Sequence, residues 1–409
     1  MEMKLKQITA GLVAVAMLGS NPIFAQSSPK VSNDVVKIGV LTDLSGTYSD
    51  LAGPGSVIAA KMAIADFSKD GTVLGKKIEL VSADHQNKAD IAANKAREWY
   101  DKDNVDVIVD LVSTNTALAV MEVAEQKNKI TLISGAGSTA ITNEKCTPVN
   151  VHWAYDTYGL ANGTAKAVVK QGKKNWYFIT ADYAFGASLE SAATNVVTAG
   201  GGKVLGVSKA PFPNNDFSSY LLKAQASGAD VVALANAGQD TINSVKQASE
   251  FGINKKQTVV PLLMFISDVH SLGLPTAQGM LMTEGFYWDR DEKTRAWSRR
   301  FFEQHKRMPT MVHAAVYSSV MNYLKTVQAT GTDDTTVVMQ KLKATPIDDG
   351  LFKGKIRADG KFSHEMFLLE VKKPSDAKSP WDYYYIRDVI PAADSSIPLA
   401  MSKCKLVKN

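Results

Sequence analysis

The chain has 409 residues, of which 45% are hydrophobic, with 46 basic and 41 acidic side chains. A chain of this length can form two domains of ordinary size, each with its own core. The net charge of +5 is dispersed along the sequence rather than gathered in a basic run, which argues against nucleic acid as a partner.

Residues 1–25 have the pattern of a secretory signal peptide. A short basic start with Lys4 and Lys6 precedes an apolar run over residues 8–18, and small residues end the segment at Ala25. The alternative is a membrane anchor, but the run is shorter than the roughly 20 apolar residues that span a bilayer. We therefore expect cleavage after Ala25 and a mature protein in the periplasm.

Residues 35–67 predict a buried strand, a loop and a helix. Val36, Ile38 and Val40 show little polar alternation, which is typical of a parallel strand covered on both faces. The loop over residues 43–55 is rich in Ser, Gly and Tyr and follows the carboxyl end of the strand. Open α/β sheets bind their ligands at that end. The helix has one apolar stripe, made by Val57, Ala60, Ile64 and Phe67.

Strand and helix patterns then alternate in two series, separated by an extended aromatic segment at 149–158. The first series continues with strands at 77–82, 106–111 and 129–134 and helices at 89–100 and 116–127. The second has strands at 176–180, 203–208, 230–236 and 258–265 and helices near 185–198, 217–227 and 241–252. Such alternation predicts an α/β fold with parallel strands joined by helical crossovers.

A second extended segment at 280–288 precedes two more helices, at 293–306 and 311–327, and a strand-rich end at 351–389. Two α/β series joined by extended segments indicate two lobes that share a hinge. We predict that one lobe contains residues 35–153 and 289–347. The other would contain residues 154–288 and 348–409.

The chain has two cysteines, Cys146 and Cys404. An even number of cysteines in an oxidising compartment favours a disulfide, which here would attach the C-terminal tail to the body of the protein. The alternative is two independent thiols, with Cys146 buried and Cys404 on a frayed tail.

Several segments together resemble the type I periplasmic binding proteins of ABC importers, in particular the leucine/isoleucine/valine-binding family. They include KIGVLTDLSG at 37–46, SGAGSTAIT at 134–142 and DYAFG at 182–186, and their order and spacing carry the resemblance over about 35–390. The resemblance implies two Rossmann-like lobes with parallel sheets and a three-segment hinge, closing on a small ligand. It also implies a monomer that meets the membrane subunits of an ABC permease.

In lobe one, the resemblance places a carboxylate on the loops after the third and fourth strands. Ser113 and Thr114 match the first of these loops, and Ala136 and Ser138 match the second. Hydroxyl and backbone N–H groups at helix starts suit an anion. Tyr48 would form a wall of the same lobe. The alternative for both serines is that they only cap helices.

In lobe two, the D-x-x-[YF]-G motif gives Phe185 as a cleft residue, although Phe185 could instead belong to the core. The loop after the strand at 230–236 gives Asn236 and Gln239. We expect these side chains to meet the ligand when the lobes close.

One departure from the family bears on the ligand. Amino-acid binders carry an acidic residue after the strand at 258–265, where this chain has Phe265 and Ile266, while Asp268 lies out of register. A buried ammonium without a counter-charge is costly. We therefore predict a carboxylate without an α-amino group. The apolar cleft points to an aromatic acid such as a benzoate or hydroxycinnamate derivative.

Two alternatives to this function remain open: a branched-chain or related amino-acid binder, and a sensor that reports its ligand to a membrane receptor. Residues 135–140 match G-x-G-x-x-A, but the motif is not on the first strand, so we expect no dinucleotide or other cofactor. The histidines form no ligand-spaced pair, and no nucleophile elbow is present, so we expect neither a metal site nor an enzyme.

Overall fold

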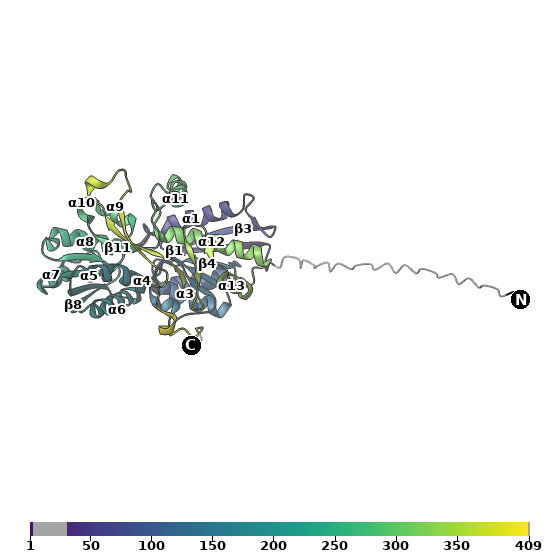
Figure 1. The fold of residues 1–409 in the computed structure, drawn as a ribbon, viewed down its shortest axis with the longest axis horizontal. Helices are drawn as coiled ribbons and strands as arrows, with labels where there is room; N and C mark the ends of the chain where they lie inside the picture. Colours follow the sequence, from purple (N-terminus) through teal and green to yellow (C-terminus); the bar gives the residue numbers. More distant parts are fainter. Residues whose placement is uncertain (3–30, 408–409) are drawn as a thin grey trace.

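The computed structural model describes residues 1–2 and 31–407 and shows two lobes side by side (Figure 1). The predicted signal peptide, residues 1–25, lies outside the described residues except for its first two, so it stays a prediction. Within the described part of the chain, no helix has the length and apolar character needed to span a bilayer.

Lobe one is built on a six-stranded sheet that is parallel except for one short edge strand. In spatial order its strands are β2 (Thr72–Val73), β3 (Lys76–Asp84), β1 (Val35–Thr42), β4 (Val107–Asp110), β5 (Ile130–Ile133) and β6 (Asn150–His152). Its first helices are α1 (Gly53–Phe67), α2 (Ala89–Asp101) and α3 (Thr114–Lys127). Every residue of β4 and β5 is buried, as expected for strands covered on both faces.

Lobe two has a four-stranded parallel sheet in the order β10 (Thr258–Pro261), β9 (Val231–Ala235), β7 (Asn175–Ala181) and β8 (Lys203–Ala210). Its helices are α4 (Thr157–Leu160), the π-helical turn η2 (Ala161–Ala165), α5 (Lys166–Lys170), α6 (Ala184–Ala199), α7 (Ser218–Ala226), α8 (Gln239–Glu250), α9 (Ile266–Leu272) and α10 (Leu274–Ala277). The predicted α/β fold with parallel sheets in two lobes is confirmed.

After β11 (Leu281–Glu284), three helices follow: α11 (Glu292–His305), α12 (Met311–Thr330) and α13 (Thr335–Ala344). Figure 1 shows α11 and α12 beside α1 of lobe one. The Oγ1 of Thr310, which caps α12, donates to the Leu51 carbonyl at 2.7 Å. His313 bonds the Ala52 carbonyl at 2.8 Å. These buried bonds attach α12 to the start of α1.

Two small antiparallel sheets complete the fold. One contains β12 (Ile347–Asp348), β13 (Lys353–Ile356) and β14 (Phe362–His364), and the other contains β11, β15 (Met366–Val371) and β16 (Tyr384–Ile390). Short 3₁₀ turns lie at η1 (Thr139–Thr142), η3 (Ile253–Lys255), η4 (Pro374–Asp376) and η5 (Leu399–Met401).

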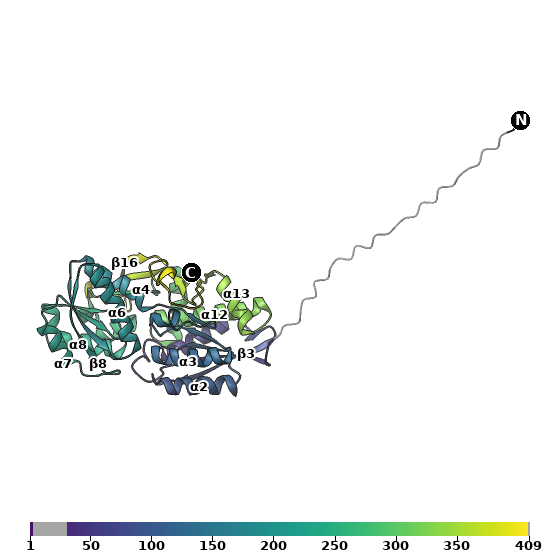
Figure 2. The same ribbon diagram turned by 90° about the horizontal axis from the view of Figure 1, so that it is seen from below.

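The chain runs between the two large sheets after β6 and again after β11, and β14 of one small sheet leads into β15 of the other; these three segments are the first, second and third crossings. His364, at the third crossing, bonds the Ala154 carbonyl of the first at 2.8 Å, so the crossings pack against each other. The predicted disulfide between Cys146 and Cys404 is confirmed. It holds the C-terminal tail, whose end is marked C in Figure 2, against α3 and the segment after η1, where Lys405 pairs with Glu125 and the Lys403 N–H donates to Asn143. The lobe boundaries remain a prediction.

Candidate functional site

The loop after β1 is shaped by one buried carboxylate. Asp43 accepts hydrogen bonds from the backbone N–H groups of Gly46 at 2.7 Å and Tyr48 at 2.9 Å, and from the Asn87 amide at 2.6 Å. These bonds satisfy the charge of Asp43 and turn the chain just past the end of β1. As a result, the Tyr48 ring is held at the face of lobe one that meets lobe two.

A small cavity lies between the lobes at the carboxyl ends of their strands. It is lined by Tyr48, Leu51, Val112, Gly135, Gly137, Tyr155, Tyr183, Phe185, Ala237, Leu263 and Phe265. The cavity holds about 10 Å³ of free space, roughly what one water molecule needs. An organic ligand therefore enters only if the lobes or the lining side chains move apart. None of these lining residues carries a charge.

The two lobes touch across this cavity. The hydroxyls of Tyr48 and Tyr183 are 2.5 Å apart, and the Gln239 N–H donates to the Thr47 carbonyl at 3.1 Å. The ring of Phe212 stacks on both tyrosines, with centroid distances of 5.2 Å to Tyr48 and 4.5 Å to Tyr183. These contacts make the described conformation a closed one.

None of the four predicted carboxylate-binding residues of lobe one is among the lining residues, although each is next in the chain to Val112, Gly135 or Gly137 or to another of the four. Ser113 is fully buried, and its hydroxyl neither caps α3 nor has a hydrogen-bond partner among the described residues. Ser138 differs, because its hydroxyl caps η1 by accepting from the Ala140 N–H at 3.2 Å. Thr114 accepts from the Ser138 N–H at 3.4 Å, and Ala136 stands between two glycines that line the cavity.

Of the predicted lobe-two residues, Phe185 lines the cavity, whereas Asn236 and Gln239 turn toward α8. The Asn236 amide donates to Ser244 at 3.0 Å and accepts from Thr241 at 2.8 Å. Gln239 is exposed, and its amide donates to Asn243 at 2.8 Å. Their side-chain groups are therefore already partnered in this conformation.

After β10, the chain presents apolar groups to the cavity. Phe265 lines it, and Ile266 is buried at the start of α9. Asp268 caps α9, because its carboxylate accepts from the Phe265 N–H at 3.0 Å. Burial raises the pKa of Asp268 to about 7. The acidic side chain of this region thus serves its own helix and does not line the cavity.

Sequence reasoning missed several lining residues: Leu51, Val112, Tyr183, Ala237 and Leu263. Tyr183 could have been found, since it stands inside the DYAFG motif two residues before Phe185. The position of Phe212 could not have been predicted, because its loop contacts Tyr48 and Tyr183 only in the folded protein. Tyr155, which the sequence left between hinge packing and ligand wall, lines the cavity and also bonds the Gly135 carbonyl.

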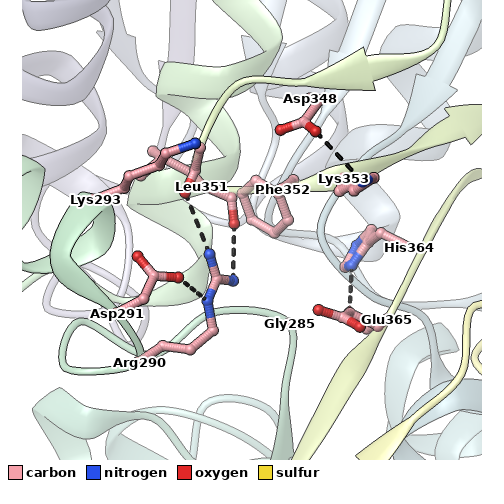
Figure 3. A pocket seen from close by; sticks show the side chains of 11 residues that line it. Gly285, Arg290, Asp291, Lys293, Asp348, Leu351, Phe352, Lys353, His364 and Glu365 are labelled. Atoms are coloured by element: carbon pink, nitrogen blue, oxygen red, sulfur yellow. Dashed lines mark hydrogen bonds and ion pairs between the residues drawn. The ribbon is translucent and has the colours of Figure 1, made fainter.

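A second cavity, of about 220 Å³, lies beside the hinge between the start of α11, the β12–β13 turn and the third crossing (Figure 3). Arg290, at one side of it, points at the carbonyls of Leu351 and Gly350, at 3.0 and 3.2 Å, and pairs with Asp291. The Arg290 donors are thus used to join the segment after β11 to the β12–β13 turn. The cavity between the lobes is the better candidate site.

The comparisons with known proteins agree with this architecture. A family model described as periplasmic binding protein matches residues 35–378. A crystal structure of a periplasmic binding protein from Burkholderia mallei is 53% identical, with a TM-score of 0.90, covering 92% of this chain and 100% of that one.

Two further relatives carry more specific names. A branched chain amino acid ABC transporter periplasmic ligand-binding protein from Burkholderia xenovorans LB400 is 39% identical, with a TM-score of 0.81, covering 91% of this chain and 100% of that one. The Leu/Ile/Val-binding protein homolog 6 of Brucella melitensis is 25% identical over 402 residues, 94% of this chain and 96% of that protein. The chain therefore belongs to the type I periplasmic binding proteins of the leucine/isoleucine/valine-binding family, periplasmic proteins that bind small molecules for ABC transporters.

Proposed function

We propose that this protein closes its two lobes on a small carboxylate with an aromatic body and no ammonium group, and delivers it to an ABC permease. Benzoate and hydroxycinnamate derivatives are the expected class. The observation that carries this proposal is the lining of the cavity, which contains five aromatic rings and no acidic side chain among the described residues. An ammonium buried there would find no carboxylate among these lining residues.

A hydrogen-bond donor that is unused in this conformation favours a ligand with a carboxylate. The Ser113 hydroxyl is buried without a partner, and leaving such a group unsatisfied costs roughly 1–3 kcal/mol. A carboxylate oxygen at the ends of β4 and β5 would accept this hydrogen bond. The aromatic end of the ligand would replace the contacts that Tyr155 and Phe265 now make with each other at a centroid distance of 6.2 Å.

Matched ligand pairs test the proposal. 3-Phenylpropionate and phenylalanine differ only in the α-ammonium, as do 4-methylpentanoate and leucine, so each pair isolates the effect of that charge. We expect the amine-free acids and benzoates to raise the melting temperature in a thermal-shift assay. A ligand at a hundred times its Kd adds about 2.7 kcal/mol of stability. Stabilisation by leucine or phenylalanine alone would contradict the aromatic-acid assignment.

The second candidate is a branched-chain amino acid, favoured by the name of the Burkholderia xenovorans relative. It requires a negative counter-charge for the ammonium, which the described lining residues do not supply, so a carboxyl such as Asp268 would have to turn inward. A sensor role uses the same binding step. Uptake of labelled ligand in cells that lack this protein separates delivery from sensing.

A further inference from the structure

Three consecutive carbonyls of the loop after β5 are held by the first hinge crossing. The His152 ring bonds the Ala136 carbonyl through Nε2 at 2.6 Å. The Tyr155 hydroxyl donates to the Gly135 carbonyl, and the Thr157 N–H donates to the Gly137 carbonyl at 2.8 Å. The crossing therefore fixes the peptide planes of a loop whose residues Gly135 and Gly137 line the cavity.

The same three peptide groups also contain the N–H groups of Ala136, Gly137 and Ser138, which differ in their hydrogen bonding. The Ala136 N–H donates to the Leu111 carbonyl at 3.1 Å, and the Ser138 N–H donates to Thr114 at 3.4 Å. The Gly137 N–H is the exception, because no described residue accepts a hydrogen bond from it. Gly137 also lines the cavity, so this donor belongs to a residue of the candidate site.

The free donor belongs to the peptide that His152 holds. In a planar trans peptide the carbonyl and the next N–H point in opposite directions. Because the Ala136 carbonyl is fixed toward His152, the Gly137 N–H is turned away from His152. A Cβ at Gly137 would lie 2.8 Å from the Tyr155 ring, so the missing side chain lets this backbone approach the aromatic wall.

The protonation of His152 follows from its surroundings. Its side chain is fully buried, and burial together with the nearby Lys361 ammonium lowers its pKa well below the usual range, so the ring is neutral. A neutral imidazole has one N–H, and a carbonyl can only accept, so the proton is on Nε2. Among the described residues, nothing bonds Nδ1, which leaves the Ala136 contact as the one hydrogen bond of the ring.

We propose that His152 is a positioning residue for ligand binding: its hydrogen bond to Ala136 orients the peptide that presents the Gly137 N–H to the ligand carboxylate. This inference rests on the proposed carboxylate ligand and deepens it. His152 ends β6 and begins the first crossing, so the residue that orients the binding loop is also attached to the hinge.

The test replaces the donor and then restores it. His152→Leu and His152→Met remove the N–H, whereas His152→Gln keeps an N–H donor on a side chain of similar reach. We expect the donor-free variants to bind 3-phenylpropionate or benzoate about ten- to a hundredfold more weakly, because the misoriented Gly137 N–H would lose its hydrogen bond to the charged carboxylate. His152→Gln should recover most of that affinity. In the ligand-free protein, the ¹⁵N resonance of Gly137 should shift in the donor-free variants and return toward its wild-type position in His152→Gln.

His364→Leu is the matched control. His364 is an equally buried hinge histidine, but it bonds the carbonyls of Trp153 and Ala154 at 3.2 and 2.8 Å rather than the binding loop. It should lower stability and leave the Gly137 resonance in place. Donor-free His152 variants that fold with wild-type affinity and an unmoved Gly137 resonance would overturn the role of His152. Failure of the wild type to bind any acid would instead count against the proposed function, and the Gly137 resonance would still decide the role of His152.

Discussion

Two serines that look alike in the sequence have different roles in the structure. Ser113 precedes α3 without capping it, whereas Ser138 caps η1 through the Ala140 N–H. We predict that Ser113→Ala weakens carboxylate binding tenfold or more, because a hydrogen bond to a charged group is lost, while the ligand-free protein keeps or gains stability because a buried hydroxyl without a partner is removed. Ser138→Ala should lower the free energy of unfolding by about 1 kcal/mol through the lost cap.

Calorimetric titration with benzoate and urea unfolding check this pair of variants. The two readouts should separate the serines: affinity falls most in Ser113→Ala, and stability falls most in Ser138→Ala. Wild-type affinity in a folded Ser113→Ala protein would remove Ser113 from the candidate site.

The buried carboxyl of Asp268 gives a prediction about pH. Its pKa is about 7 in the folded protein and about 3.9 in an unfolded chain, so the native state keeps a proton that the unfolded state loses. The stability that Asp268 contributes is therefore full below about pH 4 and is lost as the pH rises through 7. The Asp268→Asn side chain has no such proton but can still accept from the Phe265 N–H.

We expect the stability of the wild type to fall relative to Asp268→Asn between pH 5 and pH 8. Urea unfolding of both proteins across that range measures the difference, in which the contributions of all other titrating groups cancel. A constant difference would mean that Asp268 is already ionised in the folded protein at pH 5.

At the scale of elements, the C-terminal tail depends on its covalent link. The Cys146–Cys404 disulfide closes a segment with a sequence separation of 258 residues. The Lys405–Glu125 ion pair nearby, at 3.0 Å, is exposed and contributes little. We predict that the Cys146→Ala, Cys404→Ala double variant loses about 2–5 kcal/mol of unfolding free energy. Limited proteolysis should then cut the tail before the lobes. An intact tail and unchanged stability would show that other contacts hold it.

The elements themselves could largely be predicted from the sequence, because strand and helix periodicities are local. The helices expected at 293–306 and 311–327 are α11 (Glu292–His305) and α12 (Met311–Thr330). Side-chain direction was harder to predict. Asn236 follows β9 as expected, yet its amide turns to Ser244 and Thr241 on α8, which a linear pattern does not record.

Contacts between segments far apart in the chain could not be predicted either, because a local sequence pattern does not record them. Nothing in the sequence near Phe212 indicates that its ring stacks on Tyr48, which comes from the other lobe. The disulfide could be predicted because two cysteines allow only one intramolecular pairing. The hinge bonds from His152, Tyr155 and Thr157 to one loop required the three-dimensional arrangement.

For the whole molecule, ligand binding shifts an equilibrium between open and closed lobes, and contacts across the cleft set its starting point. The Tyr48–Tyr183 hydroxyl pair is one such contact, at 2.5 Å in a largely apolar surround. We predict that Tyr183→Phe favours the open form, since it removes this hydrogen bond while keeping the ring that stacks on Phe212. A lost hydrogen bond between neutral groups is worth about 0.5–1.5 kcal/mol, so the closed population should fall about two- to tenfold relative to the open one.

Small-angle X-ray scattering of the ligand-free protein measures this shift as a larger radius of gyration, and a saturating acid ligand should restore the compact value. Tyr177→Phe is the matched control, because the Tyr177 hydroxyl bonds Ser208 at 2.7 Å entirely within lobe two. Its scattering should match that of the wild type. If both variants scatter as the wild type does, the phenol pair does not set the closure equilibrium, and the stacking of Phe212 between the lobes would be the contact to test next, by Phe212→Ala.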